Sequence, residues 1–295
     1  MNILWRYPMS RPQTAHYDQV NFPETIRSYY MLSSQPFNSS YHMHDSYELL
    51  LFLHGDGDYY IEHRRIHMKR GNLLLINSNE IHRAEVSGKM PYERIATHFS
   101  PDWIRNFSTP DSDLLSCFEK RPVGERNLLF LDNTALEQYL ALADRMHTAL
   151  AADHFGHDVL AAAYLVQLLI LVNICFHSLQ EQPAALPPLS SQIMGYINKH
   201  LQESITVGQL AAYVHLDPSY LSRKFREQAG CSLQEYIILK RIACAKDLLR
   251  QGKSVTEACQ GSGFHDYANF IRTFKKHAGI PPGQYGRKHQ TQSRF

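Results

Sequence analysis

The sequence lacks the features that identify several common classes of protein. Its five cysteines are widely spaced and no CxxC pair occurs, so we expect neither a disulfide framework nor a cysteine-rich zinc site. No P-loop, GxGxxG or GxSxG motif is present. The first residues, MNILWRYPMSRPQ, contain no long apolar run, which argues against a signal peptide. These absences favour a cytoplasmic protein. They give no indication of a P-loop nucleotide hydrolase, a dinucleotide-dependent enzyme or a serine hydrolase.

Long apolar runs are also scarce. The segment LAAAYLVQLLILVNICF at residues 160–176 is nearly all apolar, but it includes Gln167 and Asn173 and is short for a bilayer span. We therefore interpret it as a helix packed between protein surfaces, and we expect no membrane partner.

Charge is almost balanced over the whole chain, with a formal net charge of +2, but it is unevenly distributed. Residues 191–295 carry a net charge of +8, whereas residues 1–190 carry −6. A basic C-terminal third on an otherwise acidic chain suggests a module that binds a polyanion. The length of 295 residues is sufficient for two domains.

The hydrophobic pattern divides the chain into regions. Between about residues 20 and 100, short apolar runs such as YELLLFL and GNLLLIN alternate with turn signals such as HGDGD, which predicts a β-barrel or sandwich with a hairpin turn at HGDGD. Helical periodicity follows over residues 134–152 and 158–179. The segment EQPAALPPLS at 181–190 is Pro-rich and is interpreted as a linker, after which the chain is helical.

The C-terminal third contains an internal repeat with an offset of 49 residues. SYLSRKFREQAGCSLQEY at 219–236 aligns with ANFIRTFKKHAGIPPGQY at 268–285, and a shorter helical segment precedes each copy. Asp217 and Asp266 are placed to cap the second helix of each unit. Two helices joined by a tight turn, with basic residues on the second helix, form the helix-turn-helix pattern. The aligned pairs include Leu221 with Phe270, Arg223 with Arg272, Phe225 with Phe274, Gly230 with Gly279 and Tyr236 with Tyr285.

Helical spacing separates a buried face from an exposed one in these second helices. Leu221 and Phe225 are expected in the core, and so are Phe270 and Phe274. Arginine can pair with guanine and asparagine with adenine in the major groove, whereas outer lysines suit phosphates. The positions expected to face double-stranded DNA are Ser219, Ser222, Arg223, Arg226, Ala268, Asn269, Arg272, Lys275 and Lys276. A packed helical hairpin with a charged surface, or a module for RNA or a protein partner, is the alternative, although no stacking-aromatic RNA motif is visible.

The segments SYLSRKFREQAGCSLQEYI and GFHDYANFIRTFKKHAGIPPGQYGR resemble the AraC/XylS transcriptional regulators over about residues 190–290. The resemblance implies two helix-turn-helix units joined by a long helix at 233–251, with each second helix in a major groove. It also implies RNA polymerase as a partner, a homodimer, and regulation by a small-molecule effector, with activation as the expected direction. One departure is Gly261, expected inside the first helix of the second unit, where it would cost up to about 1 kcal/mol relative to alanine.

The front of the chain resembles a cupin barrel. The cupin motifs are matched by His42, His44, Glu48 and Gly55, and then by Gly71 and His82. Three interpretations of the four polar residues stay open: a metal-free pocket for a sugar or other polar metabolite, a divalent metal site, or a polar cluster that only satisfies itself. In the pocket interpretation Tyr59 and Arg65 would also bind the effector, and Tyr47 and Tyr60 could add contacts. No cofactor is required in it.

A metal-dependent cupin sensor or enzyme fused to a DNA-binding module is the alternative of a different class. The remaining histidines, His54, His63, His67 and His98 among them, have no spacing typical of a ligand set, and we expect them on the surface or within strands.

These observations together predict an α+β multidomain protein with an N-terminal cupin-like β-barrel and flanking helices, followed by an all-α domain with tandem helix-turn-helix units. The expected boundaries are 1–130 for the barrel, 131–180 for a helical dimerisation segment, 181–190 for the linker and 191–290 for the DNA-binding domain.

Overall fold

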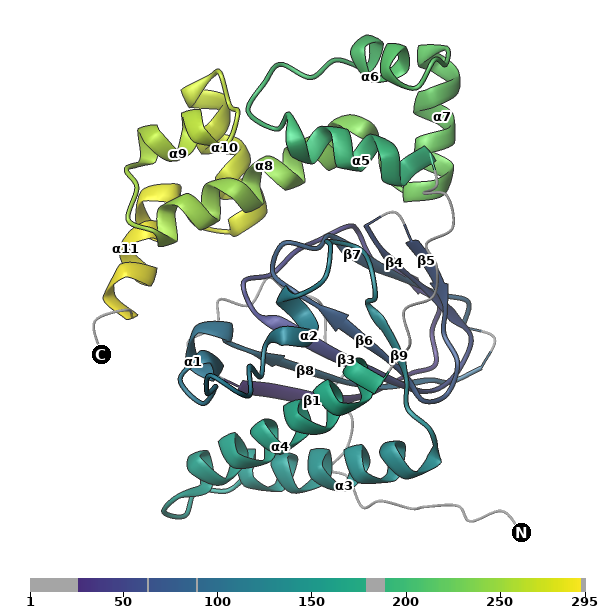
Figure 1. The fold of residues 1–295 in the computed structure, drawn as a ribbon, viewed down its shortest axis with the longest axis vertical. Helices are drawn as coiled ribbons and strands as arrows, with labels where there is room; N and C mark the ends of the chain where they lie inside the picture. The colour runs from purple at the N-terminus through teal and green to yellow at the C-terminus, as the bar shows by residue number, and fades with distance from the viewer. Residues whose placement is uncertain (1–25, 63, 89, 179–188, 293–295) are drawn as a thin grey trace.

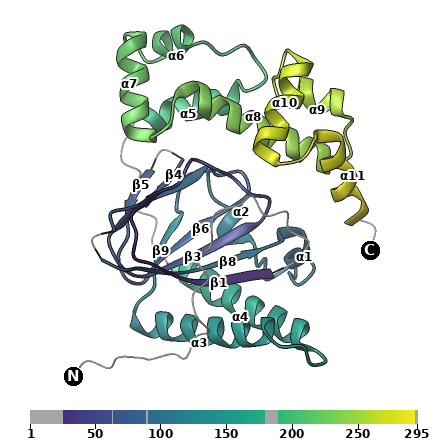
Figure 2. The same ribbon diagram turned by 180° about the vertical axis from the view of Figure 1, so that it is seen from behind.

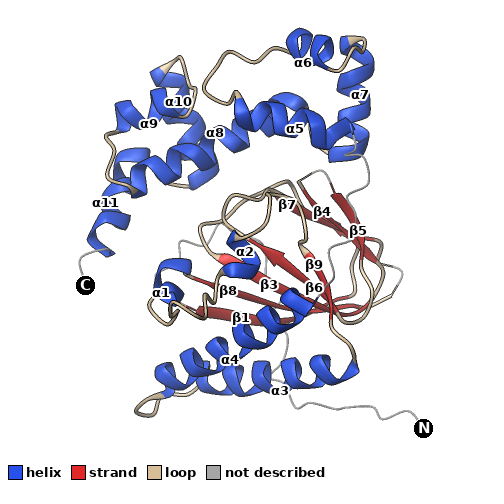
Figure 3. Ribbon diagram, in the orientation of Figure 1, coloured by secondary structure: helices blue, strands red, loops and turns tan. Residues whose placement is uncertain are grey.

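The computed structural model describes residues 26–62, 64–88, 90–178 and 189–292. A β-domain lies in the middle of the molecule, two long helices cover one side of it, and the C-terminal helices lie on the opposite side (Figure 1). The same layers are visible from behind in Figure 2, and the separation of strands from helices is clear in Figure 3. The predicted α+β multidomain class is confirmed.

The β-domain consists of two antiparallel sheets that face each other. The five-stranded sheet has the order β1 (Ile26–Ser33), β8 (Tyr92–Phe99), β3 (Tyr47–His54), β6 (Asn72–Ile76) and β9 (Leu128–Phe130). The four-stranded sheet has the order β2 (Phe37–Asn38), β7 (His82–Val86), β4 (Gly57–Ile61) and β5 (Arg64–His67). Strand β3 is apolar on both faces because Leu50 and Phe52 point between the sheets, whereas Leu49 and Leu51 point toward the helices.

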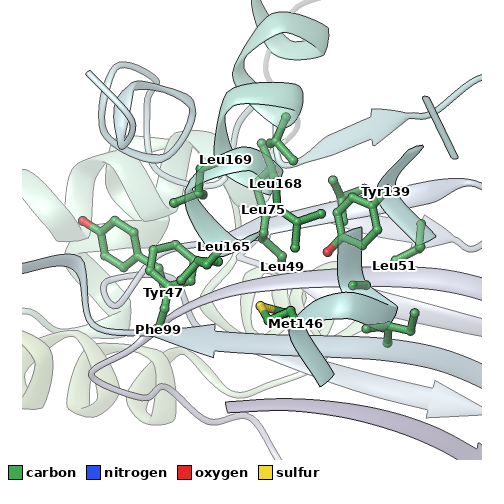
Figure 4. Packing of buried hydrophobic residues seen from close by; sticks show 14 of the residues in the cluster. Tyr47, Leu49, Leu51, Leu75, Phe99, Tyr139, Met146, Leu165, Leu168 and Leu169 are labelled. Atoms are coloured by element: carbon green, nitrogen blue, oxygen red, sulfur yellow. The ribbon is translucent and has the colours of Figure 1, made fainter. Parts of the chain in front are cut away.

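Two helices, α3 (Asn133–Leu150) and α4 (His157–Ser178), cover the outer face of the five-stranded sheet. Their apolar side chains join those of the sheet in one large core, in which Leu165, Leu168 and Tyr139 pack against Leu49 and Leu51 (Figure 4). Two short helices, α1 (Pro101–Arg105) and α2 (Ser116–Glu119), lie at the end of the same sheet.

Helix α4 contains the long apolar run, and by length and composition it could cross a membrane. One face of the helix is buried in the core, including Leu165, Leu168 and Val172, as expected for a helix packed on protein. The other face is exposed at Ile170 and Ile174. The run is therefore apolar all round, although only one of its faces has a partner within the described chain.

The C-terminal domain consists of two helical lobes that share the long helix α8 (Leu233–Arg250). The first half of α8 packs into one apolar core and the second half into another. The first lobe adds α5 (Leu189–Lys199), α6 (Val207–Tyr213) and α7 (Pro218–Ala229). The second lobe adds α9 (Val255–Gly261), α10 (Tyr267–Ala278) and α11 (Pro282–Gln292).

One expectation needs correction. The HGDGD turn joins β3 to β4, but these strands lie in different sheets and do not form a hairpin pair. Gly261 belongs to α9, as expected, and is its last residue; a Cβ at this position would lie 2.9 Å from Leu248 Cδ1, so glycine allows α9 to lie close to α8. The predicted linker at 181–190 lies mostly outside the described residues.

Candidate functional site

Four histidines and one glutamate meet between the two sheets, at one end of the β-domain. His42 and His44 precede β3, Glu48 lies on β3, His82 begins β7, and His98 lies near the end of β8. The antiparallel register pairs Glu48 directly with His98, and an isolated backbone bridge pairs His42 with His82. Segments distant in the sequence thus bring five polar side chains together, and we call these residues the His/Glu cluster.

Glu48 is the centre of the cluster. His44 Nε2 lies 3.0 Å from Glu48 Oε2, His82 Nε2 lies 3.5 Å from the same oxygen, and His98 Nε2 lies 3.8 Å from Glu48 Oε1. The ring centroids of His42 and His82 are 4.3 Å apart. The buried Nε2 of His82 has no hydrogen-bond partner among the described residues. This nitrogen can therefore accept a bond from, or coordinate, a further group.

Burial and the neighbouring charges decide the protonation states. Burial would raise the pKa of Glu48, but the imidazoles of His98 and His44 outweigh it and hold that pKa far below its usual value. Burial opposes the charged form of His44, yet the hydrogen bond that its Nε2–H donates to Glu48 raises its pKa. Desolvation lowers the pKa of His98 to about 4 and that of His82 well below its usual value. At neutral pH the cluster thus combines one carboxylate–imidazole pair with neutral imidazoles.

The donor set fits a divalent first-row metal ion. One ligand atom each from His44, Glu48 and His98 lie within 4.8 Å of one another. Ligands at about 2.0–2.1 Å from zinc stand about 3.4 Å apart in a tetrahedral site, so small side-chain movements would suffice. Neutral imidazole and carboxylate are suitable ligand types. The same groups can instead form hydrogen bonds with hydroxyls of a polar ligand.

The sequence-predicted residues are brought together only in part. His42, His44, Glu48 and His82 meet as expected. His98 also joins them: it lies within strand β8, as expected for the remaining histidines, but it was not selected as a site residue. Its spacing along the chain gives no signal, because only the β3–β8 register places it beside Glu48.

The other predicted effector contacts lie elsewhere. Tyr59 points between the sheets into the apolar core, farther from the cluster along the barrel. Arg65 does not join the cluster: its side chain is 64% exposed and pairs with Asp58 on the outer surface. Tyr47 points toward α2, where its hydroxyl donates to Glu119. Tyr60 packs against the C-terminal domain instead.

The second candidate site is formed by α7 and α10, the second helices of the two repeats. Asp217 caps α7 by accepting bonds from the Ser219 and Tyr220 amides, and Asp266 caps α10 by accepting a bond from the Asn269 amide, as predicted. Each helix ends at a glycine with positive φ, Gly230 or Gly279, which stops the helix at the equivalent point. The repeat in the sequence therefore corresponds to a repeat in structure.

The buried and exposed faces of α7 and α10 agree with the sequence pattern. Leu221, Phe225, Phe270 and Phe274 are fully buried. The predicted DNA-facing side chains are all exposed: Ser219, Ser222, Arg223, Arg226, Ala268, Asn269, Arg272, Lys275 and Lys276. Sequence reasoning did not select Tyr220 and Tyr267, which are also exposed at the start of these helices.

Two helix-turn-helix units attached to a β-domain with a buried polar cluster define a two-domain regulator of the sensor and DNA-binding type. Two family models match the chain. The AraC-like ligand binding domain matches residues 32–169, and the helix-turn-helix domain matches residues 210–288. The chain belongs to the AraC family of transcriptional regulators, with an N-terminal sensory domain.

Several known proteins are similar to the chain. An uncharacterized HTH-type transcriptional regulator of Staphylococcus aureus (strain MSSA476) is 29% identical over 145 residues, which cover 46% of this chain and 19% of the relative. The uncharacterized HTH-type transcriptional regulator YobQ of Bacillus subtilis is 37% identical over 93 residues, which cover 31% of this chain and 39% of YobQ. The chain thus spans well under half the length of these relatives.

Solved structures are also similar. ToxT from Vibrio cholerae is 13% identical, covers 89% of this chain and 97% of its own, and has a TM-score of 0.35. The DNA-binding domain of AdpA, a global transcriptional factor solved in complex with a target DNA, is 25% identical, covers 36% of this chain and 96% of its own, and has a TM-score of 0.35.

Proposed function

We propose that the protein binds double-stranded DNA sequence-specifically and regulates transcription in the cytoplasm, under the control of a small polar effector. The observation that carries the DNA-binding proposal is the pair of equivalent capped helices, α7 and α10, whose polar faces are both exposed. RNA polymerase is the proposed partner, and activation is the proposed direction, as the family resemblance implies.

The two helices have distinct proposed contacts. In this proposal Arg223 and Arg272 read guanine, and Asn269 reads adenine, because arginine and asparagine can form bidentate hydrogen bonds with these bases. Lys275 and Lys276 lie farther along α10 and suit backbone phosphates. Footprinting on a DNA site selected from random sequence should show two protected major-groove segments, about one helical turn apart on one face of the duplex. A single protected segment would argue against recognition by both units.

The proposed effector site is the His/Glu cluster. Apolar side chains, Leu50, Phe52 and Tyr92 among them, fill the space between the sheets beyond the cluster. A polar occupant would therefore contact the imidazoles and the carboxylate at one end of the barrel. A sugar or similar polyhydroxylated metabolite has the hydrogen-bonding groups that these side chains require.

A thermal-shift screen of small polar metabolites, run with and without chelator, tests this proposal. A true effector raises the melting temperature of the native protein, because it binds only the folded state. Glu48→Gln should abolish that shift, whereas Asp58→Asn, on the outer surface of the same domain, should preserve it. Equal shifts in both variants would place the binding site elsewhere.

A metal-dependent sensor is the second candidate, and the clustering of ligand atoms from His44, Glu48 and His98 favours it. Zinc bound by these groups would add a positive charge that holds the segment before β3 against β8. Metal analysis of the purified protein and titration with zinc test this candidate. His98→Ala should weaken zinc binding by about tenfold or more, and no change would remove His98 from the ligand set.

We further propose a homodimer that forms through the exposed face of α4. Ile170, Leu171 and Ile174 line a groove between α3 and α4, together with Leu142 and Arg145. Its volume is about 420 Å³, which is enough to receive side chains of a second copy. Apolar residues exposed together on a long helix favour association with a matching apolar surface.

The mass of the protein in solution tests the dimer. Ile174→Glu should give a monomer in analytical ultracentrifugation, because a charge in an apolar interface is costly to desolvate. Val159→Glu is the matched control, since Val159 is also exposed on α4 but lies about 22 Å along the helix axis from Ile174. Dimers of equal affinity in both variants would argue against this surface.

A further inference from the structure

The segment Tyr41–Ser46 contacts the DNA-binding domain through alternate side chains. The Tyr41 hydroxyl donates a hydrogen bond to the carbonyl of Ala229, at the end of α7. Met43 packs against the apolar cores of both helical lobes. Asp45 accepts from Lys246 Nζ at 3.2 Å and Arg250 Nη1 at 3.4 Å, both on α8. The odd-numbered residues of the segment thus reach both lobes of the other domain.

The even-numbered residues of the same segment belong to the His/Glu cluster. His42 is fixed by the backbone bridge to His82, in which each amide donates to the other carbonyl at 3.1 Å. His44 Nε2 bonds Glu48, while its Nδ1 lies 2.8 Å from the carbonyl oxygen of Ser46. Successive side chains therefore point in opposite directions, toward the cluster and toward the DNA-binding domain, as in an extended chain.

The close approach to the first lobe depends on a glycine. Gly230 has a φ of 75° and follows α7 directly, and a Cβ there would lie 2.8 Å from the Tyr41 hydroxyl oxygen. The helix terminus thus lies directly against the segment. The exposed faces of α7 and α10 point away from this contact, so docking leaves the proposed DNA-reading side chains open.

We propose that Tyr41–Ser46 is a coupling segment, through which a change in the His/Glu cluster alters how the DNA-binding domain is docked, and the reverse. The proposal rests on the proposed function of the cluster as a sensor site. Neighbouring Cα atoms are only 3.8 Å apart, so a displacement of His42 or His44 moves Met43 and Asp45 as well. Such coupling is reciprocal: loosening either side of the segment loosens the other.

The contact sets the placement of the two lobes on the β-domain without masking the DNA-facing helices. Asp45 holds the second half of α8, while Tyr41 holds the end of α7 in the first lobe. A shift in the segment would therefore change the orientation of both recognition helices together. This is a means by which a small occupant of the cluster could act on DNA affinity.

Hydrogen-exchange mass spectrometry of the full chain tests the proposal without a known ligand. Glu48→Gln alters the cluster, and among the described residues the ion pairs of Glu48 are all with cluster histidines. It should nevertheless speed exchange about fivefold in peptides that contain Lys246, which corresponds to the loss of roughly one hydrogen bond. Asp58→Asn is the control on the same domain, and it should leave those peptides unchanged.

A second variant tests the coupling from the opposite side. Lys246→Gln should speed exchange about fivefold in peptides that cover residues 41–54, which include the cluster residues of the segment. Exchange in peptides from α4 reports whether the β-domain stays folded in each variant. If Glu48→Gln unfolds this domain, the result for Lys246→Gln alone tests the proposed coupling. The proposal is overturned if Lys246→Gln leaves these peptides unchanged, or if a folded Glu48→Gln does not affect α8. If the wild-type protein does not bind DNA specifically, that result contradicts the proposed function and not the proposed coupling segment.

Discussion

A buried ion pair between the domains gives the sharpest prediction for stability. Lys240 Nζ on α8 lies 3.2 Å from Glu62 Oε1, and the two side chains are 8% and 2% exposed. Glu62 also accepts from the Ile81 amide and from the Tyr236 hydroxyl, at 3.1 and 2.7 Å. The network ties the turn after β4 to the first lobe of the DNA-binding domain.

Lys240→Met removes the only cation of this pair and leaves the Glu62 carboxylate without its counter-charge. Breaking a buried pair in this way costs roughly 3–5 kcal/mol if the remaining charge stays buried. Because Glu62 lies at a domain interface, separation of the domains would expose it to water and relieve that cost. We therefore expect both domains of the variant to stay folded. The free energy by which the two domains stabilise each other through docking should fall by up to about 3 kcal/mol.

Urea unfolding of the full chain measures this effect with two probes. Both tryptophans, Trp5 and Trp103, precede the C-terminal domain, so their fluorescence reports the N-terminal part, whereas far-UV circular dichroism also follows the C-terminal helices. In the wild type the two probes should show unfolding transitions at the same urea concentration. In Lys240→Met the two transitions should occur at different concentrations. With a slope of about 1–3 kcal/mol per molar urea, a 3 kcal/mol loss moves the C-terminal midpoint by about 1–3 M.

A matched control is the exposed pair of Arg65 and Asp58 on the same β-domain. Arg65→Met should change stability by less than about 1 kcal/mol, because solvent screens an exposed pair. Adding Glu62→Gln to Lys240→Met should recover part of the loss, since no buried charge is then left unpaired. Coincident transitions in Lys240→Met, with the wild-type midpoint, would refute the reasoning.

Three further predictions concern the folded domains. Asp217→Ala should lower the thermal stability of the C-terminal domain by about 1 kcal/mol, because two amides at the start of α7 lose their cap; an unchanged melting temperature would contradict the capping role. Phe270→Ala should cost about 3–5 kcal/mol in urea unfolding, since it empties the centre of the second lobe, and a loss below 1 kcal/mol would argue against this packing. Burial lowers the pKa of His147, so the unfolded chain binds more protons below about pH 6.5 and stability falls as the pH drops from there toward the lowered value. The urea midpoint of His147→Gln should therefore depend less on pH between about 5.5 and 7 than that of the wild type, and an equal dependence would exclude His147 as a source.

Local patterns predicted the C-terminal domain well, because each of its signals acts over a few residues. The caps at Asp217 and Asp266 and the buried pairs Leu221–Phe225 and Phe270–Phe274 depend only on helical spacing, and the structure confirms them. Gly261 lies in α9 as predicted, but the reason for a glycine there is the close contact with Leu248 on α8, which the sequence does not display.

Long-range pairing limited the prediction of the β-domain. The HxH motif indicated where His42 and His44 lie, but the approach of His98 to Glu48 follows from the β3–β8 register, which joins residues about 50 positions apart in the chain. Arg65 was expected at the effector site, yet its position on β5 turns it outward. The docking of Asp45 on α8 spans about 200 residues and left no local signal in the sequence.

The central claim, that α7 and α10 each read DNA bases, is tested most directly by the affinity for a selected DNA site. Wild-type protein, Arg223→Ala and Arg272→Ala are compared by fluorescence anisotropy, with Arg70→Ala, in the exposed turn before β6, as the control. We predict that each recognition-helix variant loses about 10- to 100-fold in affinity and loses base preference at a different half-site, whereas the control binds as the wild type does. Unchanged affinity and unchanged preference in both variants would contradict the assignment of α7 and α10 as recognition helices.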